Sequence, residues 1–260
     1  MFRVRAPLVA VLAGAGLLLA ACGPQPAQSS APASETETHA AYLTPPAVTD
    51  IALSAGQMLI SGTAAPNARV RLATPTGVTS LATADAAGLW RLSAPAQPQA
   101  ALYGLSQSLG GQTVQAEGYV MVTPAGAGYL LRAGAGAVRL GRPATQGITA
   151  VDFDREGAAV VSGRAPAGTS LSAWVDGRRA AEGRADQAGA FSLSLNAPLR
   201  DGGHDVKVFG ESIDSRIAFS AAQAQPLVGG PFRVVPTAGG VRVDWITPGG
   251  GVQSTVVAAS

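Results

Sequence analysis

Short stretches in which large apolar residues alternate with small or polar ones recur along this chain of 260 residues. Trp90 and Leu92 lie two positions apart, and so do Phe191 and Leu193. A period of two is typical of β-strands with one buried face, because successive side chains point to opposite sides of a sheet. An Asp and a Gly before each pair predict a tight turn that leads into the strand.

The chain carries this pattern twice, at a constant spacing. Residues 61–68 match residues 162–169, and the turn and strand at 85–92 match 186–193. The offset is 101 residues in both matches. Two separate matches with one offset indicate an internal duplication.

Gly, Pro, Asn and Asp residues divide each copy into short predicted strands. In the first copy these strands are 48–54, 57–62, 69–73, 78–83, 89–93, 102–106 and 112–116. In the second copy they are 149–154, 158–163, 170–175, 178–184, 190–195, 205–210 and 216–220. Short strands with breaks roughly every 8–12 residues predict a β-sandwich in each copy.

The composition favours an all-β protein with two domains. Only 13% of the residues are charged, 47% are hydrophobic and 33 are Gly, which suits short strands joined by turns. Each copy of roughly 100 residues is long enough to bury its own core. Removal of Arg3 and Arg5 with the N-terminal segment would reduce the 18 basic residues to 16, equal to the 16 acidic ones. A neutral chain without a basic cluster argues against nucleic-acid binding.

The N-terminal segment has the three parts of a lipoprotein signal peptide. Arg3 and Arg5 form a basic region, and residues 6–19 form an apolar run that is short for a membrane span. The run ends in Leu-Ala-Ala-Cys at residues 19–22, which resembles a bacterial lipobox. The resemblance implies a signal peptide over 1–21 and fatty acids such as palmitate on Cys22, which would tether the protein to a membrane. An ordinary signal peptide or an uncleaved anchor are the alternatives.

Residues 22–45 are predicted to be a lipidated, disordered tether. They are mostly Pro, Ala, Ser, Thr, Gln and Glu, with little apolar surface to bury, and the segment would reach about 25–30 Å. Gly23 stands where an Asp marks retention in the inner membrane of well-studied Gram-negative bacteria. The resemblance to such lipoproteins therefore implies the outer membrane, on its periplasmic or its exterior side.

Three motifs resemble those of bacterial immunoglobulin-like (Big-type) domains, which occur in tandem on surface and periplasmic proteins. They are a Ser-Gly-x-Ala turn, an Asp-x-x-Gly-x-aromatic-x-Leu strand and a Gly-x-His-x-Val-x-Val-like strand. These motifs lie at 61–68, 85–92, 162–169, 186–193 and 202–208. The third motif is degraded in the first copy. The resemblance implies sandwiches over 46–118 and 146–221 and a role as spacer, adhesin or accessory module, without catalytic residues.

A predicted meander of three short strands around Gly-rich turns follows each sandwich, at 119–145 and at 222–260. The two align at an offset of 112 residues, which matches Trp245 with the small Ala133. A three-stranded meander is marginal alone, so each must pack on its own sandwich or on the other meander. A large residue opposite a small one suits two interdigitating surfaces. Both arrangements bury Trp245.

Residues that suggest chemistry are few. His204 is the only histidine after the tether, and it opens a strand of a structural motif, so no nucleophile–base pair is expected. Asp152, Asp154 and Glu156 lie on one face of a predicted strand and could offer oxygen ligands to Ca²⁺. We favour the simpler interpretation that they form a solvated strand face. No metal and no cofactor is expected.

Tryptophans are the candidates for a binding platform. Trp90 lies in a core strand, and Trp174, before the Asp-Gly hairpin at 176–177, is also expected in the core. Trp174 and Trp245 are nevertheless the possible binding surface. We expect a membrane-tethered, non-enzymatic envelope lipoprotein that acts as a structural or protein-binding module with an unidentified envelope protein partner. The alternatives are a glycan- or peptidoglycan-binding module and an enzyme with unrecognised acidic residues.

Overall fold

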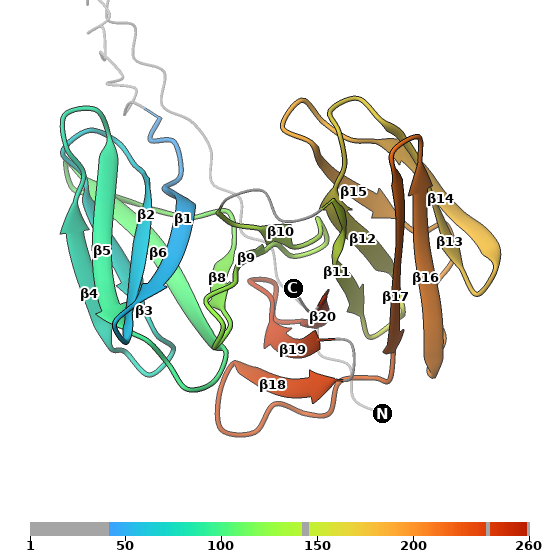
Figure 1. The fold of residues 1–260 in the computed structure, drawn as a ribbon. Coiled ribbons are helices and arrows are strands. Elements are labelled where there is room, and N and C mark those ends of the chain that lie inside the picture. The colour runs from blue at the N-terminus through green and yellow to red at the C-terminus, as the bar shows by residue number, and fades with distance from the viewer. Residues whose placement is uncertain (1–41, 142–145, 238–239, 259–260) are drawn as a thin grey trace, which may run out of the picture. The chain divides into compact units, whose positions relative to one another are not determined.

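The computed structural model describes residues 42–141, 146–237 and 240–258. The predicted signal peptide, Cys22 and nearly all of the predicted tether lie outside the described residues. Tyr42–Ser260 form one compact unit. Regular structure in the described ranges consists of β-strands, which confirms the all-β fold class (Figure 1). No helix within these ranges is long and apolar enough to cross a membrane.

Seven strands close to the predicted ones form the first sandwich. They are β1 (Ala47–Ser54), β2 (Gln57–Thr63), β3 (Arg69–Ala73), β4 (Thr79–Thr83), β5 (Leu89–Pro95), β6 (Ala101–Leu109) and β7 (Gln112–Gln115). One sheet has the order β1-β2-β5, and β4, β3, β6 and β7 lie together in the other. In β5, Trp90, Leu92 and Ala94 are buried and the residues between them are exposed, as the period of two predicts.

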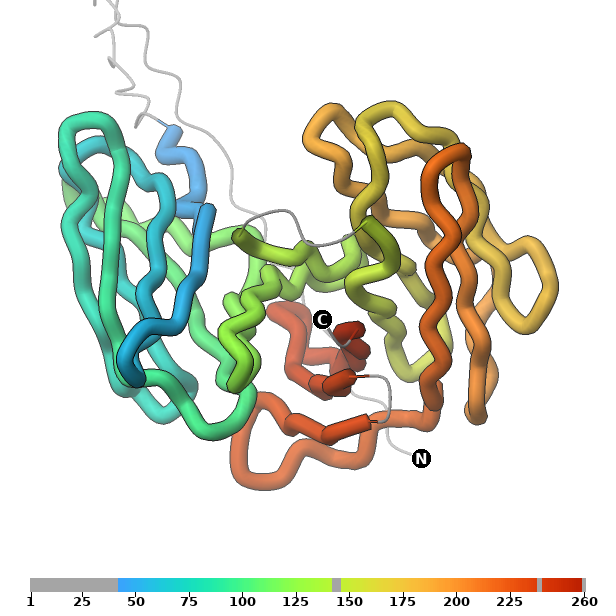
Figure 2. Tube along the Cα trace, in the orientation of Figure 1, coloured from blue at the N-terminus to red at the C-terminus, as the bar shows by residue number. Residues whose placement is uncertain are grey.

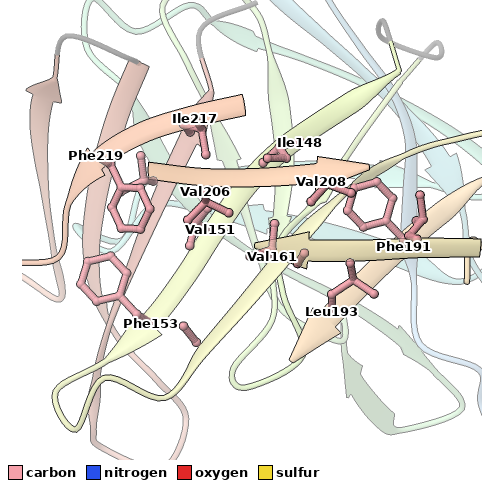
Figure 3. Packing of buried hydrophobic residues seen from close by; sticks show 14 of the residues in the cluster. Ile148, Val151, Phe153, Val161, Phe191, Leu193, Val206, Val208, Ile217 and Phe219 are labelled. Atoms are coloured by element: carbon pink, nitrogen blue, oxygen red, sulfur yellow. The ribbon is translucent and has the colours of Figure 1, made fainter. Parts of the chain in front are cut away.

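The second sandwich repeats this topology. Its strands are β11 (Gly147–Asp154), β12 (Ala159–Arg164), β13 (Ser170–Val175), β14 (Arg178–Arg184), β15 (Ala190–Ser194), β16 (Gly203–Gly210) and β17 (Ile213–Ser220). The sheets β11-β12-β15 and β14-β13-β16-β17 enclose a core to which both contribute, for example Phe153 of β11 and Phe219 of β17, whose rings stack with centroids 5.8 Å apart (Figure 3). Equal strand pairing in both copies supports the duplication.

The repeated glycine of the Ser-Gly motif makes room for an aromatic ring. A Cβ atom added at Gly62 would lie 2.5 Å from the ring of Trp90, and one at Gly163 would lie 2.5 Å from the ring of Phe191. At both positions the Cβ would also lie within 2.2 Å of a backbone carbonyl oxygen of the neighbouring strand. These rings come from the second repeated motif. The two motifs therefore recur together because the glycine of one and the aromatic residue of the other form one packing contact.

The repeated aspartate holds the turn before that aromatic strand. Asp85 Oδ1 accepts hydrogen bonds from the backbone N–H groups of Ala87 (2.8 Å) and Leu89 (2.9 Å). Asp186 accepts the corresponding two bonds in the second copy. Both motifs are thus explained by folding rather than by chemistry at a site.

Three further antiparallel strands follow each sandwich. They are β8 (Tyr119–Val122), β9 (Gly128–Leu131) and β10 (Val138–Arg139) in the first meander, and β18 (Phe232–Thr237), β19 (Gly240–Ile246) and β20 (Val252–Ala258) in the second. The first meander joins β6, whose residues 101–103 pair with β8. The second joins β11 through β20, so the red end of the chain returns to the yellow-green start of the second repeat (Figure 2). The two meanders therefore extend different sheets of their sandwiches.

The apolar faces of the two meanders meet in one buried cluster, which we call the shared core. Its fully or almost fully buried members are Leu102, Met121, Ala127, Tyr129, Leu131, Ala137, Ala150, Val243, Trp245 and Val257. The sequence left open whether each meander packs on its own sandwich or on the other meander, and the structure shows both contacts. Each meander pairs with its own sandwich through a strand edge, and its apolar face remains free to pack on the other meander.

Candidate functional site

Trp245 lies at the centre of the shared core, with no solvent-exposed surface. Its ring meets the ring of Tyr119 edge-on, with centroids 5.8 Å apart and an interplanar angle of 84°. Its Nε1–H donates a hydrogen bond to Thr255 Oγ1 at 3.1 Å. The prediction that Trp245 could belong to a binding surface is therefore wrong, because the first meander already covers the face of the strand that carries it.

Asp152 is also buried, although the sequence favoured a solvated strand face for it. Its carboxylate accepts hydrogen bonds from the N–H of Ala137 (2.7 Å), from Thr255 Oγ1 (2.6 Å) and from Gln253 Nε2 (3.1 Å). The solvated interpretation fails at Asp152 because both meanders cover this side of β11. Burial raises the pKa of Asp152 to about 6, against the opposing effect of these three donors.

The acidic residues around β11 do not converge on one point. Asp154 accepts a hydrogen bond from the N–H of Ala158 at 2.8 Å, within its own turn. The described ranges contain no group of three or more His, Cys, Asp or Glu side chains that could hold a metal ion. The geometry therefore gives no support to a calcium site at Asp152, Asp154 and Glu156.

A second buried carboxylate, Asp244, is neutralised by two arginines. It accepts hydrogen bonds from Arg233 Nη2 (2.5 Å), Arg242 Nε (2.7 Å) and Ser254 Oγ (2.7 Å). Burial alone would raise the pKa of Asp244, but these bonds and the charge of Arg242 lower it overall. The guanidinium of Arg242 also lies 5.1 Å from the ring centroid of Phe153. This network joins the second meander to the second sandwich.

His204 has both ring nitrogens engaged. Nδ1 lies 2.7 Å from Asp176 Oδ2, and Nε2 lies 2.7 Å from the carbonyl oxygen of Arg200. Burial alone would lower the pKa of His204, but the bonds to Arg200 and Asp176 raise it above its usual value. A histidine bonded in this way clamps the hairpin tip at Asp176 to β16, and neither nitrogen is free to act as a base.

Trp174 is outside the core, contrary to the expectation from the sequence. Its neighbours Ala173 and Val175 point into the sandwich, so the alternation along β13 turns the Trp174 ring outward. The ring is partly exposed, and Nε1–H donates to Ser172 Oγ at 3.3 Å. Of the two residues of the possible binding surface, only Trp174 is accessible.

A surface hollow of about 460 Å³ surrounds Trp174, and we call it the Trp174 hollow. It is lined by Ser172, Trp174, Gly177, Lys207 and Phe209. In the register of β13 and β16, Trp174 lies opposite Lys207, and Ser172 lies opposite Phe209. Two aromatic rings and one ammonium group thus share the outer face of two neighbouring strands.

Lys207 is the basic group at the centre of this hollow. Two other basic residues of the same sheet are neutralised, Arg179 by Glu182 and Arg216 by Asp205. Within the ranges that the structure describes, no carboxylate oxygen lies within 4.0 Å of the Lys207 ammonium. Its ammonium therefore retains hydrogen-bond donors for a ligand.

The first repeat lacks all three of the side chains that shape the hollow. The strand registers of the two sandwiches match Trp174, Lys207 and Phe209 with these residues of the first: Ala73, Gly104 and Ser106. A Cβ atom at Gly104 would meet nothing within 4 Å, so packing does not force the small residue there. A position-by-position comparison of the two copies in the sequence could have revealed the hollow, because large side chains in the second copy stand where the first copy has small ones.

A second hollow, of about 410 Å³, lies on the outer face of β1-β2-β5 and is lined in part by Asp50, Leu59 and Arg91. The corresponding face of the second sandwich is covered, because Gly136 of the first meander lies against Val160 and neighbouring residues. The hollow on the first sandwich contains no aromatic side chain. The Trp174 hollow is therefore the better candidate for ligand binding.

Comparisons with known proteins give no family for this chain. No family model matches it, and no curated protein matches it. Among solved structures, the chain is similar to "Biofilm associated protein - BSP domain", with 14% sequence identity and a TM-score of 0.25. The match covers 71% of this chain and 30% of that chain, so this chain spans less than a third of that structure.

Proposed function

We propose that the protein is a non-enzymatic lipoprotein of the bacterial cell envelope that is tethered through Cys22 and presents two immunoglobulin-like units in a fixed relation. The signal-like segment that ends in the only cysteine supports the anchor. Gly23 after that cysteine favours the outer membrane. The partner in this role is another envelope protein.

The shared core is the observation that carries this proposal. Besides its apolar contacts, the N–H of Ala137 donates to buried Asp152 (2.7 Å), and the N–H of Gly134 donates to Gln253 Oε1 (3.1 Å). These bonds join the two repeats across their own interface. Buried polar contacts require a definite geometry, so they favour one orientation of the repeats over many. A rigid pair of sandwiches suits a module that holds a binding face away from a membrane.

The chemistry of the described residues favours binding over catalysis. Asp152 is a carboxyl group with a raised pKa, but three donors surround it in the shared core. His204 has both nitrogens bonded. Neither group offers the open contact with a substrate that general acid–base catalysis needs. A glycan-binding role is the second candidate, and the Trp174 hollow favours it.

Metabolic labelling with a fatty acid tests the anchor. The wild type should be labelled and should partition into the detergent phase, and Cys22→Ser should lose both properties. Labelling of the Cys22→Ser variant would refute the lipobox assignment. Crosslinking in intact cells then identifies the partner, and capture of only lipid and peptidoglycan would count against a role in protein assembly.

Distance measurements between the repeats test the fixed relation. The Cys22→Ser background has no other cysteine, so spin labels can be placed at exposed Val78 and Arg178, one on each sandwich. We expect one narrow distance distribution. A broad distribution in otherwise unaltered protein would overturn the rigid arrangement.

A further inference from the structure

The Trp174 hollow has the chemistry of a ligand site that the fold does not require. Its aromatic and basic side chains come from β13 and β16, the central strands of a four-stranded sheet. The same strands in the first sandwich carry Ala73, Gly104 and Ser106 at these places, and that sandwich still buries a core of its own. The three large side chains of the second repeat are therefore not explained by folding.

The hairpin at one rim of the hollow is fixed by hydrogen bonds outside it. Its rim at Gly177 belongs to the β13–β14 hairpin, whose Asp176 accepts hydrogen bonds from His204 (2.7 Å) and from the N–H of Asp205 (2.9 Å). These bonds attach the hairpin to β16, the strand that carries Lys207. The hairpin and the strand that carry the side chains of the hollow are therefore fixed relative to each other before a ligand binds, which lowers the entropy cost of binding.

We propose that the Trp174 hollow binds an acidic polysaccharide, with sugar rings against Trp174 and Phe209 and a sugar carboxylate on Lys207. One face of a pyranose ring presents C–H groups, and an indole or phenyl ring offers the matching apolar, electron-rich surface. A charge-assisted hydrogen bond to a carboxylate would give Lys207 the acidic partner that Arg179 and Arg216 already have.

Size and charge favour this ligand over other classes. A hollow of about 460 Å³ falls within the range of small-ligand sites, roughly 300–1,000 Å³. A protein interface buries roughly 800 Å² on each partner, which is much more than a hollow lined by five residues offers. The basic residues around the hollow also fall short of the basic stripe that nucleic acids require, because Arg179 and Arg216 are already paired with carboxylates. A chain of sugar acids needs only a few such contacts for each residue.

Tryptophan fluorescence reports on this hollow selectively. Trp90 is 2% exposed and Trp245 is 0% exposed, so acrylamide should quench mainly Trp174. The probes are polygalacturonate, alginate and hyaluronate, with fully methyl-esterified polygalacturonate as a polymer of the same sugar without the charge. We expect saturable protection of Trp174 by at least one acidic polymer and at least tenfold weaker binding of the methyl ester. Absence of protection by all three acidic polymers would overturn the proposal.

Variants locate the site by retention in polysaccharide-containing native gels, a measurement that does not need the Trp174 fluorescence. Trp174→Ala and Lys207→Gln should each weaken binding at least tenfold while melting within a few degrees of the wild type. The matched control is Arg71→Gln, which removes an exposed positive charge from β3, the corresponding strand of the first sandwich, and should bind like the wild type. Wild-type binding by Trp174→Ala would place the ligand elsewhere and refute the site. Equal binding of the methyl ester, or wild-type affinity of Lys207→Gln, would refute the acidic ligand.

The outcome is separable from that of the tethered-module proposal. Trp174→Ala leaves Cys22 and the shared core unchanged, so fatty-acid labelling and the distance between the sandwiches should stay as in the wild type. Loss of glycan binding with both of these preserved supports the hollow as a distinct site. A changed distance distribution in Trp174→Ala would contradict that independence.

Discussion

Truncation of Trp245 to Ala should loosen the shared core and lower the stability of the whole described unit. The side chain is completely buried, packs edge-on against Tyr119 and donates to Thr255 Oγ1. Thr255 in turn donates to Asp152 at 2.6 Å, so the ring also supports a buried polar chain. The substitution therefore removes apolar contacts from both meanders. It also removes one member of the series of hydrogen bonds that connects the two repeats.

The expected loss is about 3–5 kcal/mol in the free energy of unfolding, the usual cost of deleting a buried aromatic ring. Of this, about 0.5–1.5 kcal/mol belongs to the edge-on pair with Tyr119. Trp245→Phe should cost less, about 1–2 kcal/mol, because most of the ring volume stays and Thr255 keeps its bond to Asp152. The difference between the two variants measures the part that depends on ring size.

Guanidinium unfolding followed by circular dichroism measures these values, and a double-mutant cycle with Tyr119→Ala isolates the ring pair. The control is Trp90→Ala, which removes an almost equally buried ring from the core of the first sandwich. Both variants should be destabilised, but only Trp245→Ala should broaden the distance between labels on the two sandwiches. A Trp245→Ala variant that unfolds like the wild type and loses a partner would refute the packing role and restore this residue as a binding surface.

Three further substitutions test the buried polar groups and the repeated glycine. The pKa of Asp152 is raised to about 6, so its contribution to stability is complete below about pH 4 and is lost as the pH rises to about 6. In Asp152→Asn the melting temperature should therefore depend less on pH over that range. The same variant should lose about 1–3 kcal/mol at pH 7, since its amide faces three donors. The pKa of His204 is raised, so its contribution to stability is complete below about pH 6.5 and is lost as the pH rises through the higher pKa of the folded state. His204→Gln should remove this pH dependence of the melting temperature. A variant with the same pH dependence as the wild type would contradict the clamp. Gly163→Ala places a Cβ 2.2 Å from the carbonyl oxygen of Gly147 and 2.5 Å from the ring of Phe191, so it should cost at least about 1–3 kcal/mol in a thermal melt. Gly203→Ala meets nothing within 4 Å and should be nearly neutral.

Much of the fold was predictable because its signals are local. Alternation along β5 and β15 places Trp90 and Phe191 in the two cores, and the aspartates that precede them form the turns. The duplication adds a second reading of each strand, so an error in one copy can be checked against the other. Strand ends were less certain, as in β17, which begins at Ile213 rather than near residue 216 because the β16–β17 turn is tighter than expected.

The candidate site was only partly predictable, since it depends on which face of a strand meets another part of the chain. Trp174 was expected in the core because tryptophan is usually buried, but the inward places on β13 belong to Ala173 and Val175. Its neighbours Lys207 and Phe209 are more than 30 residues away and meet it only through the pairing of β13 with β16.

The sequence by itself determined the all-β class, the duplication, most of the strands and the structural roles of the repeated Asp and Gly residues, because each of these depends on side-chain alternation and turn chemistry within a few residues. Only the tertiary structure decided that Asp152 is buried, that Trp245 lies in a core shared by both repeats and that Trp174 faces solvent. Asp152 finds Gln253 and Thr255 across 101 and 103 residues of chain. The two meanders, although duplicated, join different sheets because β20 pairs with β11 and β8 pairs with β6. Edge pairing and burial by distant segments are properties of the assembled sheets, and no local pattern records them.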